Sequence, residues 1–138
     1  GDTTRGGLRR LPGLLERHSP TLVIIELGGN DGLRGYPVAS LRANLEQMAE
    51  LAQSAGAAVI LLPMEIPPNY GARYASGFRE SYRTVADATD SVLGPFILDG
   101  VATDPALMQA DGIHPTAGAQ AALLENVLPV IVDTLARL

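Results

Sequence analysis

Runs of apolar residues alternate along this chain with segments in which apolar residues recur at helical spacing. The first run, residues 21–27, is almost continuously apolar at its centre, as is typical of a strand buried on both faces of a parallel sheet. Residues 57–62 form a second such run that ends before Pro63, and residues 96–98 predict a short third strand. The alternation of strands and helices predicts an α/β fold with a mostly parallel sheet.

Helical spacing predicts a helix in each of the longer intervening segments. One stripe comprises Val38, Leu41, Leu45, Met48 and Ala52, a second Tyr74, Phe78, Tyr82 and Val85, and a third Ala117, Ala121, Leu124, Leu128, Ile131 and Leu135. An N-terminal helix is predicted by Leu8, Leu11 and Leu15. Because proline lacks an amide donor and clashes with the preceding turn, we expect an interruption at Pro12-Gly13 and a break near residue 128, before Pro129.

Composition favours one domain over residues 1–138 and excludes several classes of function. A net charge of −5 without a basic cluster argues against nucleic acid or an anionic membrane as partner. No uninterrupted apolar run reaches the roughly 20 residues of a spanning helix, so no stable membrane insertion is expected. The absence of cysteine excludes a thiol nucleophile, and the absence of lysine excludes Schiff-base chemistry and a Walker-type lysine.

Asp111 and His114 are the first candidate for chemistry. They stand three residues apart on the turn that enters the predicted last helix, close enough for the carboxylate to hold one imidazole nitrogen while the other faces a nucleophile. The alternative is structural: Asp111-Gly112 makes a turn, Pro115 starts the helix and His114 caps it.

Asn30 is the second candidate, because it follows a buried strand at the end where open α/β sheets bind ligands. Its side-chain amide could donate to a developing oxyanion. It could also be a turn asparagine that tolerates a left-handed backbone beside two glycines, and both interpretations can hold at once. Asp31 could be a catalytic carboxylate, but we favour a hydrogen bond that fixes the loop. The glycine-rich residues 32–37 are either a loop that moves over the site or a plain surface turn.

Three blocks together resemble a known family. Gly1-Asp2-Thr3-Thr4, Gly28-Gly29-Asn30-Asp31 and Asp111-Gly112-Ile113-His114-Pro115, in this order and spacing, are similar to the SGNH (GDSL-type) hydrolases, within them to the thioesterase I and arylesterase subgroup. The resemblance runs the length of the chain and implies a three-layer α/β/α, flavodoxin-like fold. If residues 21–27 form strand 3 of that fold, the N-terminal strand or strands are missing and one apolar edge is unpaired.

The resemblance also implies the roles of site residues. Gly1 would offer a backbone amide and Asn30 a side-chain amide to the oxyanion, with His114 as general base and Asp111 as the residue that orients it. Gly29, Ile66 and Pro67 would contact substrate. The implied substrates are small acyl thioesters, aryl esters and lysophospholipid-like esters, hydrolysed without a cofactor by a periplasmic or secreted enzyme.

The serine nucleophile of the family is not found in its expected context. The block that carries it would precede Gly1, and none of the six serines has that context: Ser19, Ser40, Ser54, Ser76, Ser81 and Ser91. We therefore expect the nucleophile to lie upstream and these residues alone to be inactive. The alternatives are an inactive or acyl-binding remnant and, less favoured because only two histidines are present, a metal site built from Asp99, Asp104, Asp111 and His114.

Overall fold

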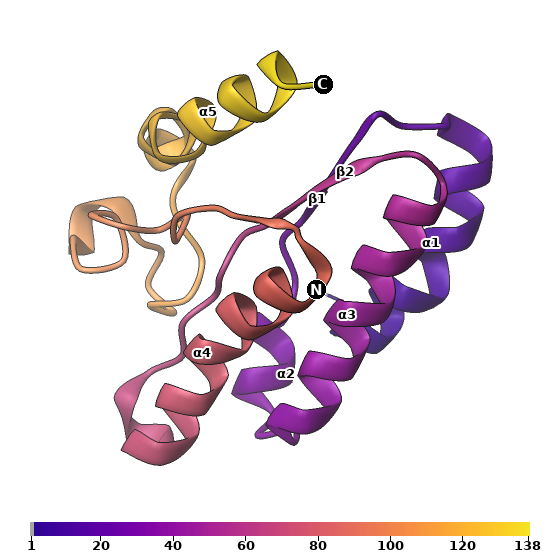
Figure 1. Cartoon of the computed structure of the whole chain (residues 1–138). Helices are drawn as coiled ribbons and strands as arrows, with labels where there is room; N and C mark the ends of the chain where they lie inside the picture. The colour runs from indigo at the N-terminus through magenta and orange to yellow at the C-terminus, as the bar shows by residue number, and fades with distance from the viewer. Residues whose placement is uncertain (1) are drawn as a thin grey trace. The chain divides into compact units, whose positions relative to one another are not determined.

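The computed structural model describes residues 2–138, which form two compact units (Figure 1). The first unit extends to Leu93 and contains a parallel sheet with helices packed on it. The second unit, Gly94–Leu138, contains the last helix and has its own apolar cluster around Val101, Ala119 and Leu123.

The sheet of the first unit has three parallel strands in the order β1-β2-β3. They are β1 (Leu22–Ile25), β2 (Ala58–Leu61) and β3 (Val92–Leu93). The register pairs Leu22 with Ala58 and Ile60 with Val92. The first two predicted strands are therefore confirmed, and so is the parallel α/β architecture.

The predicted third strand at residues 96–98 is wrong. The chain pairs with β2 four residues earlier, at Val92 and Leu93, and Gly94-Pro95 then ends the pairing. Residues 97–100 form a turn in which the amide of Val101 donates to the carbonyl of Leu98 at 2.9 Å. Ile97 and Leu98 are apolar because they pack against the cluster of the second unit.

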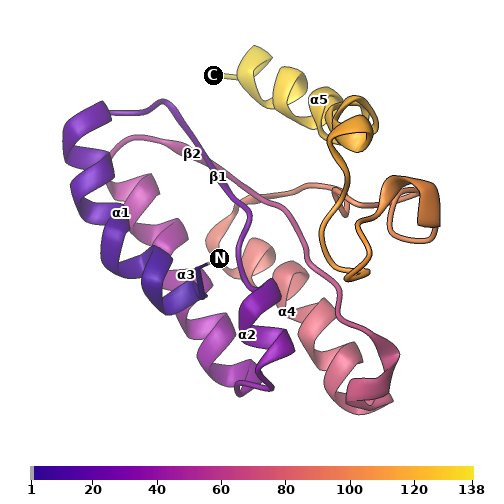
Figure 2. The same cartoon turned by 180° about the vertical axis from the view of Figure 1, so that it is seen from behind.

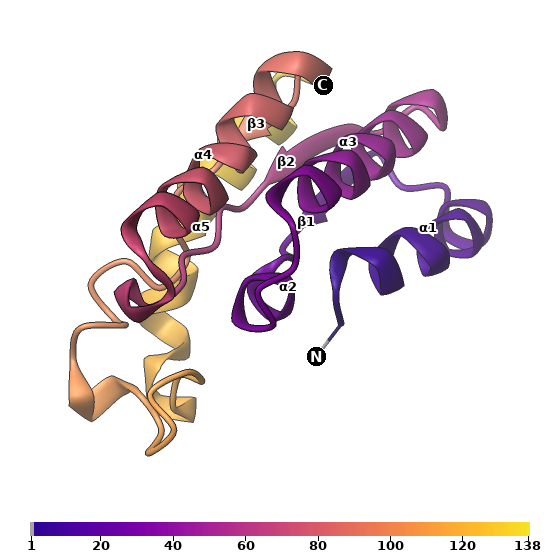
Figure 3. The same cartoon turned by 90° about the horizontal axis from the view of Figure 1, so that it is seen from below.

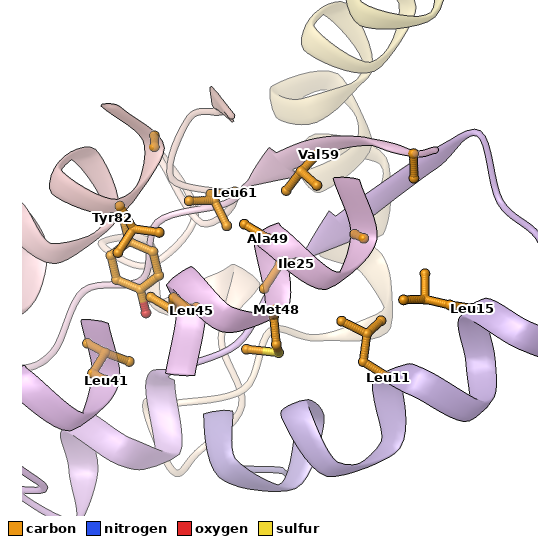
Figure 4. Packing of buried hydrophobic residues seen from close by; sticks show 14 of the residues in the cluster. Leu11, Leu15, Ile25, Leu41, Leu45, Met48, Ala49, Val59, Leu61 and Tyr82 are labelled. Carbon is orange, nitrogen blue, oxygen red and sulfur yellow. The ribbon is translucent and has the colours of Figure 1, made fainter. Parts of the chain in front are cut away.

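Three long helices lie side by side on one face of the sheet (Figure 3). They are α1 (Thr4–His18), α3 (Val38–Ser54) and α4 (Ala72–Thr89), with the 3₁₀ turn η1 (Pro68–Tyr70) just before α4. Their apolar stripes meet the inward side chains of β1 and β2, including Ile25, Val59 and Leu61 (Figure 4). Leu45 of α3 is fully buried at the centre of this core, which confirms the predicted stripe.

The expected interruption of the N-terminal helix at Pro12-Gly13 is wrong, since α1 continues through both residues. Pro12 lies on the exposed side, where water can bond the carbonyl that loses its partner. Leu11 and Leu15 are buried on the opposite side and hold both halves of the helix against the core.

β1 differs from the expected fully buried strand. It stands at the edge of the three-stranded sheet, and among residues 2–138 no strand pairs with its outer side. Ile24, whose side chain points away from the helices' core, is 41% exposed, whereas Ile25 is buried. The expectation of an unpaired apolar edge is thus confirmed within this unit.

The second unit consists of turns followed by one long helix. The 3₁₀ segments η2 (Pro105–Leu107) and η3 (Ala117–Ala119) precede α5 (Gln120–Ala136). The expected break before Pro129 is wrong, because α5 runs through this proline. Pro129 lies on the exposed side of the helix, where water can bond the carbonyl that has no amide partner. By length and composition only, Ala117–Ala136 could also cross a membrane, although no single apolar run predicts it.

Candidate active site

The short helix α2 (Gly29–Leu33) begins just beyond the carboxyl end of β1 (Figure 2). Gly28 makes the turn between them with a φ of 118°, and a Cβ there would collide with the Tyr82 hydroxyl. That hydroxyl donates to the Leu27 carbonyl at 2.8 Å, and burial raises the pKa of Tyr82, so it remains a donor. The buried tyrosine of α4 thereby fixes the direction in which the chain leaves the strand.

Asn30 occupies the second position of α2 and is half-buried. Its Nδ2 donates to the carbonyl of Asp2 at 3.3 Å. The left-handed residue of this turn is Gly28, and Asn30 has a helical backbone, so the alternative of a left-handed turn asparagine is wrong. Gly1, the other expected oxyanion donor, lies outside the described residues.

Asp31 is a buried anchor, with 3% of its surface exposed. Oδ1 accepts from the backbone amide of Thr4 at 2.8 Å, and Oδ2 accepts from the Thr4 hydroxyl at 2.5 Å. The preferred interpretation of Asp31 as a residue that fixes local structure by hydrogen bonds is confirmed. Its partner Thr4, at the start of α1, was not singled out from the sequence, because no pattern connects residues so far apart in the chain.

The expected substrate contacts lie at the carboxyl end of the sheet. Ile66 follows β2, and its side chain packs so closely on Gly32 of α2 that a Cβ there would collide with it. A Cβ at Gly29 would lie 3.3 Å from the end of the Met64 side chain. Pro67 is exposed immediately before η1. Gly29 is the first residue of α2 and Ile66 packs on the same helix, so both lie at the end of the sheet where open parallel sheets bind ligands.

Two tyrosine hydroxyls anchor the glycine-rich residues 32–37. Tyr70 donates to the carbonyl of Leu33 at 2.8 Å, and Tyr74 donates to the carbonyl of Tyr36 at 2.5 Å. These tyrosines lie in η1 and at the start of α4. They tie the loop to the segment that carries Ile66 and Pro67, a link between segments that no local sequence pattern predicts.

In the second unit, Asp111 and His114 meet within one tight turn. Oδ2 of Asp111 lies 2.7 Å from Nδ1 of His114, and Oδ1 accepts from the amides of Ile113 at 2.9 Å and His114 at 3.1 Å. Gly112 supplies the required positive φ of 68°. An antiparallel bridge between Met108 and Pro115 closes the loop. The turn thus holds the imidazole by one nitrogen and leaves Nε2 for proton transfer.

The electrostatics of this pair favour an ionised carboxylate. The hydrogen bond from His114 is the main cause that lowers the pKa of Asp111 to about 2, and the amides of Ile113 and His114 contribute. The His114 side chain is 68% exposed and accessible to a reactant. The alternative in which His114 caps the last helix is wrong, because α5 begins at Gln120, after Ala119 as N-cap.

The acidic residues considered for a metal site do not form a cluster around His114, although Asp111 contacts it. Within residues 2–138, no three His, Asp or Glu side chains form a group that could hold an ion. Asp104 caps η2 by accepting from the amide of Ala106 at 3.0 Å. Asp111 uses both carboxylate oxygens within its own turn.

The chain is similar to known proteins over most of its length. The model of the GDSL-like lipase/acylhydrolase family matches residues 1–122. Esterase TesA of Pseudomonas aeruginosa is 53% identical over 131 residues, which cover 95% of this chain and 65% of that protein. Thioesterase 1/protease 1/lysophospholipase L1 of Escherichia coli (strain K12) is 41% identical over 137 residues, covering 99% and 62%. The chain thus spans slightly less than two thirds of the length of both relatives.

A solved structure shows the same fold. The psychrotrophic esterase EstA from Pseudoalteromonas sp., inhibited by monoethylphosphonate, superposes with a TM-score of 0.95 and 40% sequence identity. The match covers 98% of this chain and 74% of that one.

Proposed function

Because the chain belongs to the GDSL-like lipase/acylhydrolase family, we propose that it serves the hydrolysis of carboxylic esters and thioesters by a serine nucleophile. His114 is the general base in this proposal, Asp111 orients it, and the serine is supplied from outside these 138 residues. The observation that carries the proposal is the Nδ1–Oδ2 hydrogen bond of 2.7 Å within the Asp111-His114 turn.

The chemistry follows from that bond. Nδ1–H donates to Asp111, so Nε2 has a lone pair and takes the proton of the serine hydroxyl as its oxygen attacks the acyl carbon. The carboxylate stabilises the imidazolium that forms. Nε2 then gives the proton to the leaving alcohol or thiol, and a water attacks the acyl-enzyme by the same route in reverse.

The side-chain amide of Asn30 and the backbone amide of Gly1 are proposed to stabilise the oxyanion of the tetrahedral intermediate. Support comes from the position of Asn30 in α2, beyond the carboxyl end of β1, where open parallel sheets bind ligands. Gly29, Ile66 and Pro67 are proposed to contact the acyl group. The names of the relatives, which include an esterase, an arylesterase and a thioesterase, favour carboxylic esters and thioesters as substrates.

The local structure around the serines supports a nucleophile from elsewhere. Ser81 is buried, accepts from Arg42 and donates to the carbonyl of Gly77 at 2.7 Å. Ser91 shares a hydrogen bond with Thr89, and Ser19 ends α1 in a left-handed conformation. The remaining three are helical residues of α3 and α4: Ser40, Ser54 and Ser76. We therefore propose that the 138-residue chain alone has no turnover.

The test compares this chain with a longer polypeptide that carries the upstream serine. Only the longer one is expected to hydrolyse p-nitrophenyl butyrate and an acyl-CoA, without inhibition by EDTA. In it, His114→Ala and Asp111→Ala should each lower kcat by about a thousandfold or more, because triad members act as a unit. His18→Ala, which removes the other histidine at the exposed end of α1, is the matched control and should leave kcat unchanged.

Two results would overturn parts of the proposal. Normal kcat in the His114 variant removes the general-base assignment. A fluorophosphonate probe should form its adduct on a serine outside the 138 residues, as found by mass spectrometry of peptides. An adduct on Ser76 or Ser40 would disprove the upstream nucleophile while leaving serine hydrolysis intact.

A further inference from the structure

We propose that Asp31 is a positioning residue for the reaction: by binding Thr4 through both carboxylate oxygens, it fixes the short helix that holds Asn30. The inference rests on the proposed oxyanion role of Asn30. It concerns three side chains that lie outside the expected triad and oxyanion donors, namely Asp31, Thr4 and Asn44.

The helix α2 has little means of holding its own shape. It contains five residues, below the length at which a helix is stable by itself, and its N-cap is Gly28, which provides no side-chain cap. The orientation of Asn30 therefore depends on contacts with other elements. Asp31, its neighbour in the chain, makes two buried hydrogen bonds of this kind, in addition to the packing of Ile66 on Gly32.

The contact joins two segments that flank the expected site. Asp31 binds the amide and hydroxyl of Thr4 at 2.8 and 2.5 Å, and Asn30 donates to the carbonyl of Asp2 at 3.3 Å. The segment of residues 2–4 is thus bonded to α2 at its first residue, Asp2, and at its last, Thr4. In the sequence, Gly1 precedes Asp2 and Asn30 precedes Asp31. Each expected oxyanion donor is therefore the covalent neighbour of a residue that bonds residues 2–4 to α2.

The direction of the hydrogen bonds requires an acceptor at residue 31. Nδ2 of Asn44 in α3 donates to the Thr4 hydroxyl at 3.0 Å, so that hydroxyl donates its own proton to Asp31. Thr4 is fully buried. An asparagine at residue 31 with its amide toward Thr4 would give the hydroxyl two donors and no acceptor.

Burying a carboxylate costs desolvation free energy, so a buried Asp31 must be stabilised by specific partners. Its charge faces the first turn of α1, where free amides and the helix dipole stabilise an anion. An apolar side chain would fill the same space with less desolvation, but it would not fix the angle between α1 and α2. Two hydrogen bonds to one residue do fix it.

The test is a double-mutant cycle in the longer enzyme. Asp31→Asn should lower kcat about tenfold or more with KM changed less than about threefold, because a displaced donor weakens transition-state binding more than substrate binding. In an Asn30→Ala background the same change should have no further effect on kcat. Asp31→Asn combined with Asn44→Asp reverses the direction of the hydrogen bonds and should recover much of the lost kcat.

Asp87→Asn, the same chemical change at an exposed position of α4, is the matched control and should alter neither kcat nor the Asn30 signal. The second measurement is the Asn30 side-chain amide in ¹⁵N–¹H spectra of the longer enzyme, which should shift in Asp31→Asn. Effects of Asp31→Asn and Asn30→Ala that multiply, or an unshifted Asn30 signal, would overturn the inference. A normal kcat in Asn30→Ala alone overturns the oxyanion proposal, while the spectra still decide whether Asp31 positions Asn30.

Discussion

The side chain of Asn30 donates a hydrogen bond to the Asp2 carbonyl and is proposed to donate another to the oxyanion, and the two can be tested separately. In the longer enzyme, Asn30→Ala should lower kcat by about a hundred- to a thousandfold, the usual cost of one oxyanion donor. The Asp2 bond is exposed, so its loss should cost only about 1 kcal/mol of stability. Melting temperature and kcat, measured on one preparation, check both; a destabilised variant with near-normal kcat would falsify the oxyanion role.

The lowered pKa of Asp111 predicts how the stability of its turn depends on pH. Its pKa in the folded chain is about 2, below the ordinary value of 3.8, mainly because His114 donates to it. Since the folded value is the lower one, the stabilising contribution is complete above about pH 3.8 and is lost as the pH falls through about 2.

A carbon-detected titration of the Asp111 carboxyl should therefore have its midpoint near 2, and His114→Ala should raise it toward 3.8. An unchanged midpoint in that variant would show that the backbone amides alone determine the pKa.

At the scale of elements, the turn from β1 to α2 predicts an effect on stability. Gly28→Ala combines a positive φ of 118° with a collision at the Tyr82 hydroxyl and should destabilise the chain by about 2–4 kcal/mol. Gly13→Ala is the matched control: nothing lies within 4 Å of the added carbon in α1, and it should stabilise by about 0.5–1 kcal/mol. Denaturant titrations at equal concentration measure both, and equal effects would contradict the structure.

Local pattern predicted most of the elements. The stripes at Leu45 and Phe78 and the run of β2 are confirmed because periodicity reports directly on burial, whereas the run of β1 predicted the strand but not its exposed side chain at Ile24. The breaks expected at Pro12 and Pro129 do not occur, since whether a proline breaks a helix depends on solvent at the freed carbonyl and on packing of the opposite side. Neither is visible in the local sequence.

Of the site, the Asp111-His114 pair was predictable because its partners are close in the chain. The anchoring of Asp31 by Thr4 and of residues 32–37 by Tyr70 was not, since those contacts join distant segments. Gly1 stays a prediction, and so do the catalytic roles.

At the scale of the whole molecule, we expect the outer edge of β1 to govern association in solution. Its backbone groups have no strand partner among the described residues, and Ile24 adds an exposed apolar side chain. We expect the 138-residue chain to self-associate at concentrations on the order of tens of micromolar. The longer polypeptide, which would supply a neighbouring strand, should be monomeric. Size-exclusion chromatography with light scattering decides this, and a monomeric short chain that unfolds cooperatively would refute it.

The self-contained turn of residues 108–115 also bears on the order of folding. The bond from Asp111 to His114 spans three residues, so closing it costs little chain entropy, whereas the parallel pairing of Leu22 with Ala58 must first bring a whole helix into place. The proposed base and its orienting carboxylate should consequently assemble early, within microseconds, in chains whose sheet is still unformed. In the longer polypeptide, catalytic competence would then appear at the rate of sheet formation, after the acid-base pair has formed.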